Sequence, residues 1–158
     1  MRACDIVRAV SDPVSSPAFA LPVRVGWGHC DPAGIVYFPR FFEMFHEAME
    51  AWFSDALSLP YQDVIVRRKV GFPAVHTEAD FAAPSVFGDR IVVQLRVEKL
   101  GGKSITFGYR VEDDGGRLRL TGRTVCAVMD LDETSATYRR GIELPPDIRN
   151  RIESFMTP

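Results

Sequence analysis

The fold is decided by one stretch in the first third of the chain, residues 39–56, which reads PRFFEMFHEAMEAWFSDA. Apolar side chains recur in it at spacings of three and four, which is the period of an α-helix. They are Phe41, Phe45, Ala48, Trp52 and Ala56, with Phe42, Met49 and Phe53 beside them. Pro39 suits the first helical position, because its missing N–H is not needed there. The pattern predicts a helix from Pro39 to near Ser58-Leu59-Pro60, whose broad apolar arc must be covered by other structure.

Strand-like sequence lies on both sides of this helix. Alternating or β-branched residues predict strands at 21–27, 72–82, 90–100, 104–111 and 118–129. Turn sequences such as Gly101-Gly102 separate them, and Pro145-Pro146 opens a short terminal helix that ends near Phe155. An apolar helix and a sheet that needs a cover together predict an α+β fold, in which a curved antiparallel sheet wraps around the helix.

Length and composition limit the domain organisation. The chain has 158 residues, enough for one domain with its own apolar core. Residues 1–19 hold Pro13, Pro17 and three serines without a sustained period, and they predict a flexible N-terminal leader. We therefore expect a single domain over residues 20–158.

Charge and cysteine content argue against several classes of protein. Nineteen basic and 21 acidic residues leave a formal net charge of −2, which supplies no general field for nucleic acid or an anionic membrane. No apolar run approaches the ~20 residues of a membrane span. Three cysteines form no CxxC pair and make a weak disulfide framework. We expect a cytoplasmic protein that binds neither nucleic acid nor membrane.

The segment before the helix carries the candidate chemistry. Residues 28–39 read GHCDPAGIVYFP and bring an imidazole, a thiol and a carboxyl group to a helix N-terminus. The unpaired N–H groups and the positive end of the helix dipole favour an oxyanion there. On spacing alone, a turn or capping role for Asp31 before Pro32 is the commoner explanation, and a catalytic role stays open.

Residues 29–39, HCDPAGIVYFP, resemble the signature of the 4-hydroxybenzoyl-CoA thioesterase family of hot-dog proteins. The likeness continues from about Val23 to Pro146, through Gly71-Phe72-Pro73, Ala79-Asp80-Phe81, Pro84, Gly88-Asp89 and Gly102-Lys103-Ser104. It implies a hot-dog fold, an antiparallel sheet wrapped around one long central helix. It also implies that an aryl- or short acyl-CoA thioester is hydrolysed to the free acid and CoA. No cofactor is implied, because CoA is part of the substrate.

The resemblance also implies roles for single residues. In that family the aspartate that matches Asp31 is the catalytic carboxylate, and it acts as nucleophile or as base for water. The backbone N–H that matches Phe38, where the family commonly has tyrosine, polarises the thioester carbonyl. Gly34 and Tyr37 are implied to contact the substrate. A thioester suits a carboxylate, because the thiolate leaves with little proton assistance.

Recognition of CoA is implied for Lys103 and Ser104, which match a hairpin that contacts CoA in related enzymes. The best-known members carry two arginines where Gly101 and Gly102 stand, so here the phosphate contacts are fewer or come from elsewhere. Candidate substitutes are Arg67, Arg68, Lys69 and Arg90. Because hot-dog subunits usually pair through sheet edges, the resemblance implies a homodimer or homotetramer with the substrate cleft between subunits.

Other interpretations of the same residues stay open. A hot-dog hydratase or dehydratase would pair His29 with Glu43 or Glu47, and a non-catalytic module would bind acyl-CoA without hydrolysis. Cys30 does not suit His29 as a nucleophile–base pair, because neighbours in an extended chain point to opposite faces. Four potential metal ligands fit no tight ligand spacing, and we expect no metal. They are His29, Cys30, His46 and His76.

Overall fold

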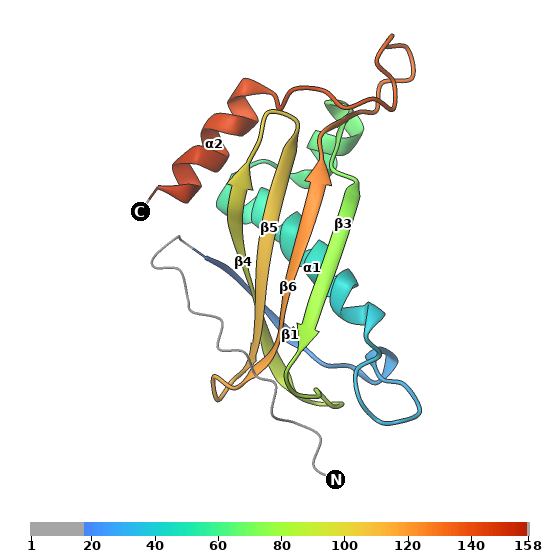
Figure 1. The fold of residues 1–158 in the computed structure, drawn as a ribbon, viewed down its shortest axis with the longest axis vertical. Coiled ribbons are helices and arrows are strands. Elements are labelled where there is room, and N and C mark those ends of the chain that lie inside the picture. Colours follow the sequence, from blue (N-terminus) through green and yellow to red (C-terminus); the bar gives the residue numbers. More distant parts are fainter. Residues whose placement is uncertain (1–17, 158) are drawn as a thin grey trace.

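The computed structural model describes residues 18–157. Five antiparallel strands form one sheet in the order β1-β4-β5-β6-β3. Their bounds are β1 Phe19–Arg24, β3 Ala74–Phe81, β4 Arg90–Leu100, β5 Ser104–Asp113 and β6 Leu118–Ala127. The long helix α1 (Pro39–Ala51) runs along one face of this sheet, and α2 (Pro146–Met156) lies at the opposite end of the molecule from the start of α1 (Figure 1).

The apolar arc of α1 packs against the inner face of the sheet. The ring of Phe45 stacks on Tyr109 of β5, with centroids 4.2 Å apart and planes within 7°. Gly122 of β6 lies against the same phenyl ring, and a Cβ at this glycine would come within 2.5 Å of it. Glycine therefore lets the helix approach the sheet closely. The predicted α+β fold, a sheet wrapped around a central helix, is confirmed.

The first strand is displaced from its predicted position. β1 begins at Phe19, which pairs with Leu95, so the last residue of the predicted leader belongs to the sheet. The rest of that prediction falls on residues 1–17, outside the described part of the chain. The strand ends at Arg24 instead of Trp27, because a 3₁₀ turn follows at Trp27–His29.

The remaining bounds agree closely with the sequence pattern. α1 continues as a π turn at Trp52–Ala56 and the helical path ends at Ser58, which has a left-handed φ of 52°. The predicted strand 118–129 ends at Ala127, and Met129 belongs instead to a separate short strand, β7, which pairs with β2. Like the 3₁₀ turn, β2 and a second π turn were not predicted, because they are too brief to show a period. The bounds of β2, β7 and this π turn are Val70–Gly71, Met129–Asp130 and Asp63–Arg67. Between residues 18 and 157, no helix combines the length and the apolar character that crossing a bilayer requires.

Candidate active site

The loop between β1 and α1 folds back on itself around a tight turn. The Gly34 N–H donates to the Asp31 carbonyl (2.9 Å), and the Asp31 N–H donates to the Ile35 carbonyl (3.0 Å). Cys30 and Val36 then face each other as an antiparallel bridge. Gly34 has a φ of +79°, a conformation that side chains disfavour. The turn itself requires this glycine, and its contact with substrate stays a prediction.

Asp31 sits half-buried in this turn, and a single hydrogen bond orients its carboxylate. Its Oδ1 accepts the Ala33 N–H at 2.8 Å, as in an Asx turn. No group of residues 18–157 donates to its Oδ2. The turn role and the catalytic role are therefore compatible, because one oxygen holds the rotamer and leaves the other for a reacting atom.

The backbone amide of Phe38 lies at the start of α1. The Tyr37 N–H donates to the His29 carbonyl, and the Arg40 N–H donates to the Tyr37 carbonyl, each at 2.9 Å. Pro39 between them has no N–H. Among the described residues the Phe38 N–H donates to none. A free amide at a helix N-terminus is suited to stabilise negative charge on a carbonyl oxygen.

A second loop, residues 84–89, packs against the loop that carries Asp31 and forms hydrogen bonds with it. The Val36 N–H donates to the Ser85 carbonyl at 2.9 Å, and Val86 pairs with Ile35 as an antiparallel bridge. Ser85 is only 1% exposed. At the level of sequence, Pro84 and Gly88-Asp89 were named only within the family likeness, and these contacts were not predicted. The likeness to the family at Pro84 and Gly88-Asp89 was the sequence feature that could have pointed to loop 84–89.

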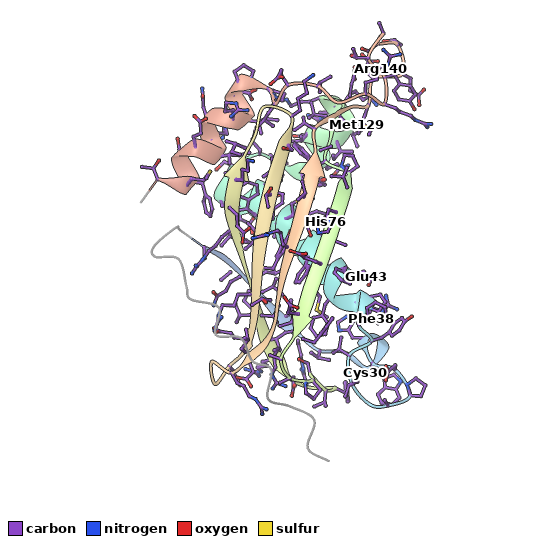
Figure 2. The ribbon with its side chains drawn as sticks, viewed as in Figure 1. Cys30, Phe38, Glu43, His76, Met129 and Arg140 are labelled. Atoms are coloured by element: carbon purple, nitrogen blue, oxygen red, sulfur yellow. The ribbon has the colours of Figure 1, made fainter. Side chains whose placement is uncertain are left out.

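An apolar rim surrounds this end of the molecule. Seven of the nine exposed large apolar side chains of the described chain gather here. They are Trp27, Ile35, Tyr37, Phe38, Phe81, Val86 and Phe87. Figure 2 shows Phe38 at the start of α1 and Cys30 in the loop that precedes the helix. Exposed apolar clusters of this kind mark a ligand site or an interface, because a monomer seldom leaves them in water.

The residues proposed for other chemistries are engaged elsewhere. The imidazole Nδ1 of His29 accepts the Gly26 N–H at 3.0 Å and so holds the turn before the loop. Glu43 pairs with Arg40 on the exposed face of α1, with a shortest N–O distance of 2.7 Å. The pair that a hydratase needs, His29 with Glu43 or Glu47, is not formed.

The potential metal ligands are scattered. His46 pairs with Glu50 at 3.0 Å, and His76 pairs with Glu78 at 3.3 Å on a different element. Residues 18–157 bring together no group of three His, Cys, Asp or Glu side chains that could hold a metal ion. Cys126 lies in the core, where burial raises its pKa to about 11 and keeps the thiol protonated. The cytoplasmic location stays a prediction.

The predicted CoA contacts lie far from Asp31 within one chain. The turn between β4 and β5 is at the opposite end of the sheet from the loop before α1 (Figure 1). Lys103 is exposed there and Ser104 is half-buried. A Cβ on Gly102 would come within 2.8 Å of Glu143 Oε2, so arginine does not fit this position without movement of that side chain. A single chain therefore does not join these residues to Asp31.

The fold is that of hot-dog proteins. Residues 25–152 match the thioesterase-like superfamily, and the chain belongs to that family. It is 37% identical over 81 residues to the 1,4-dihydroxy-2-naphthoyl-CoA hydrolase of Synechocystis sp., which is 51% of this chain and 58% of that protein. It is 29% identical over 131 residues to the 4-hydroxybenzoyl-CoA thioesterase of Pseudomonas sp., which is 78% of this chain and 89% of that protein.

Solved structures agree with this assignment. The 1,4-dihydroxy-2-naphthoyl-CoA thioesterase from Synechocystis superposes with a TM-score of 0.78 at 29% identity, over 90% of this chain and all of that one. A thioesterase superfamily protein from Jannaschia sp. gives a TM-score of 0.81 at 29% identity, over 94% of this chain and 100% of its own. The chain spans little more than half the length of the first curated relative above.

Proposed function

We propose that the protein is an acyl-CoA thioesterase in which Asp31 is the catalytic carboxylate and the Phe38 amide is the oxyanion donor. One observation carries the proposal: one loop holds an oriented carboxylate and a helix-terminal amide, and among residues 18–157 the carboxylate Oδ2 has no donor and the amide has no acceptor. Two relatives, the Synechocystis hydrolase and the Pseudomonas thioesterase, are named for hydrolysis of CoA thioesters.

The reaction joins water to the thioester and releases a carboxylic acid and CoA. Asp31 attacks the carbonyl carbon, or removes a proton from the water that does so, while the carbonyl oxygen gains negative charge. The Phe38 N–H stabilises that charge, because no group among residues 18–157 already accepts its hydrogen bond. The C–S bond then breaks, and the thiolate leaves as a weak base. If Asp31 is the nucleophile, water hydrolyses the resulting mixed anhydride and restores the carboxylate.

An aromatic acyl group is the substrate that the rim favours. Both relatives are named for aromatic acyl-CoA substrates. Here Tyr37 and Phe38 pack edge to face beside the loop at 5.4 Å, and both are about half exposed. Aromatic side chains bind a planar ring through stacked or edge-to-face contacts. We therefore expect benzoyl- and hydroxybenzoyl-CoA to be preferred to long aliphatic thioesters.

A homodimer would bring the two distant ends together. β3 is an edge strand of the sheet, and its side chains are exposed except for the half-buried Ala79. If two copies pair antiparallel through β3, the loop end of one lies beside the hairpin end of the other. Lys103 and Ser104 of one copy could then contact CoA bound near Asp31 of its partner. A homotetramer would combine two such dimers.

The test is release of free thiol from a panel of benzoyl-, hydroxybenzoyl-, short aliphatic and long-chain acyl-CoA. We expect turnover of the aryl substrates and a loss of about 10³-fold in Asp31→Asn. Asp55→Asn, an exposed aspartate on the π turn after α1, is the control and should keep wild-type activity. Binding of CoA without thiol release would indicate a non-catalytic module, and water addition to an enoyl-CoA would indicate a hydratase.

A further inference from the structure

A largely buried arginine lies on β6, outside the residues that form the proposed site. The Arg119 side chain is only 13% exposed. Its Nη2 contacts Asp113 Oδ2 at 2.8 Å and Asp89 Oδ2 at 3.4 Å, and its Nη1 donates to the Pro84 carbonyl. A guanidinium withdrawn from water needs such partners, because an unpaired buried charge is strongly destabilising.

These contacts join loop 84–89 to the sheet at both ends of the loop. Pro84 opens the loop and Asp89 closes it, whereas Asp113 belongs to β5. Asp89 also accepts the Val86 N–H within the loop at 3.0 Å. Hydrogen bonds, first from the Arg117 amide and also from Arg119, lower the pKa of Asp113. Asp113 therefore stays charged opposite the guanidinium at neutral pH.

Loop 84–89 in turn holds the loop that carries the proposed catalytic groups. The Ser85 carbonyl accepts the Val36 N–H, and Val86 bridges Ile35. The Ile35 carbonyl accepts the Asp31 N–H. Val36 lies two residues before Phe38 in the chain. A shift of loop 84–89 therefore moves both the carboxylate and the oxyanion donor.

We propose that Arg119 is a positioning residue for the thioesterase reaction. It acts through loop 84–89 to hold the Asp31 carboxylate and the Phe38 amide at the relative position that the reaction needs. The inference rests on the proposed function. Its physical basis is that the planar guanidinium of arginine, with donors in a fixed geometry, contacts the loop and the sheet at the same time. The ammonium group of a lysine, on a flexible side chain, does not reproduce these contacts. A displacement of about 1 Å at a reacting group lowers the rate by roughly 100-fold.

The experiment compares Arg119→Gln, Arg119→Lys and Arg123→Gln with wild type, well below their thermal midpoints. Arg123 lies on the same strand, is 51% exposed and pairs with Glu98 at 2.7 Å, so it is a matched control. We expect kcat on benzoyl-CoA to fall about 10- to 100-fold in Arg119→Gln with KM within about 3-fold, because binding is kept while the reacting groups are displaced. Arg119→Lys should recover part of the loss, and Arg123→Gln should match wild type.

Amide hydrogen exchange tests the same coupling without any activity. The Val36 and Asp31 amides should exchange at least about 10-fold faster in Arg119→Gln, while amides of the β4–β5 ladder stay unchanged. Wild-type exchange at Val36 together with wild-type kcat would overturn the inference, as would a loss of kcat equal to the unfolded fraction. If Arg119→Gln does not fold, Asp89→Asn weakens the same link and should show the same two changes. Faster exchange in a protein without thioesterase activity would uphold the coupling and reject the proposed function instead.

Discussion

At the end of the sheet that carries Asp31, the Phe38 amide finds no acceptor among residues 18–157, whereas at the other end the two turn carbonyls both have donors. The Arg149 side chain donates to the Gly101 carbonyl at 2.6 Å, and the Leu144 N–H donates to the Gly102 carbonyl at 2.8 Å. The first end leaves a backbone N–H for a ligand, and the second uses these two carbonyls within the fold.

The apolar side chains of the two ends show the same contrast. Phe38, beside the free amide, is 55% exposed. At the hairpin end, Ile148 and Ile152 of α2 are fully buried, and the Phe155 ring meets Trp52 edge to face at 5.5 Å. We infer that changes at the loop end should act on activity, and that changes at the hairpin end should act on stability.

Among the changes that test this contrast between the two ends, the largest effect should come from removing the Phe38 amide N–H. Phe38→Pro deletes this N–H, and the Phe38 φ of −52° already suits proline. Phe38→Ala keeps the N–H and removes the same ring, so it is the matched control. We expect kcat of the proline variant to fall about 100- to 1000-fold below that of the alanine variant, because one oxyanion donor is lost.

Thiol release and thermal unfolding should be measured on both Phe38 variants. Their thermal midpoints should agree, because neither variant loses a backbone hydrogen bond of the described residues. Equal kcat values would show that the amide is not the oxyanion donor. A lower midpoint in the proline variant alone would show that the loop end also contributes to stability, and the contrast between the ends would be weaker.

The next largest effect is expected at the hairpin end, and it should change stability instead of activity. Ile148→Ala should lower the free energy of unfolding by about 3 kcal/mol, because it leaves a cavity under α2. Its kcat should stay within about 2-fold of wild type while the protein is folded. Urea unfolding and thiol release measure the two quantities, and Asn150→Ala on the exposed face of α2 is the control. A fall in kcat beyond the unfolded fraction would place α2 in the active site.

The sequence predicted the elements with a repeated burial pattern better than the contacts that join them. The period of Phe41, Phe45 and Ala48 was enough to find α1, because burial against a sheet imposes a regular spacing. The end of β1 was missed, since the 3₁₀ turn that follows it is stabilised in part by a side-chain acceptor, His29, which accepts the Gly26 N–H. A local side-chain acceptor leaves no period for sequence analysis to detect.

The candidate site was predicted in the same uneven way. Asp31 and the Phe38 amide came from a contiguous motif, and the structure places both on one loop. The contacts of the Ser85 carbonyl and the Arg119 guanidinium were not predicted. They join segments that lie far apart in the sequence and come together only when the sheet forms. Lys103 and Ser104 lie at the other end of the sheet, and their contact with CoA depends on a second subunit, which stays a prediction.

The smallest effect is a pH dependence at the hairpin end. Arg68 makes two hydrogen bonds of 2.7 Å to Asp147 at the start of α2. The first cause of the lowered pKa of Asp147 is this bond from Arg68. A carboxyl group whose pKa is lowered by folding stabilises the protein above its unfolded pKa, and this contribution is lost as pH falls through the folded value.

Asp147→Asn should therefore be less stable than wild type near neutral pH, by about 1 kcal/mol or less, because the pair is exposed to water. Urea unfolding near pH 7, about pH 5 and about pH 3 should show a constant difference at the first two values and a smaller one at the third. Glu133→Gln, an exposed carboxylate without an ion pair among residues 18–157, should give no such trend. If the difference instead grew in acid, the pKa of Asp147 would be raised by folding, and Arg68 would not be its stabilising partner. Since kcat near neutral pH should be the same in Asp147→Asn and wild type, this ion pair separates the stability of the hairpin end from the chemistry of the loop end.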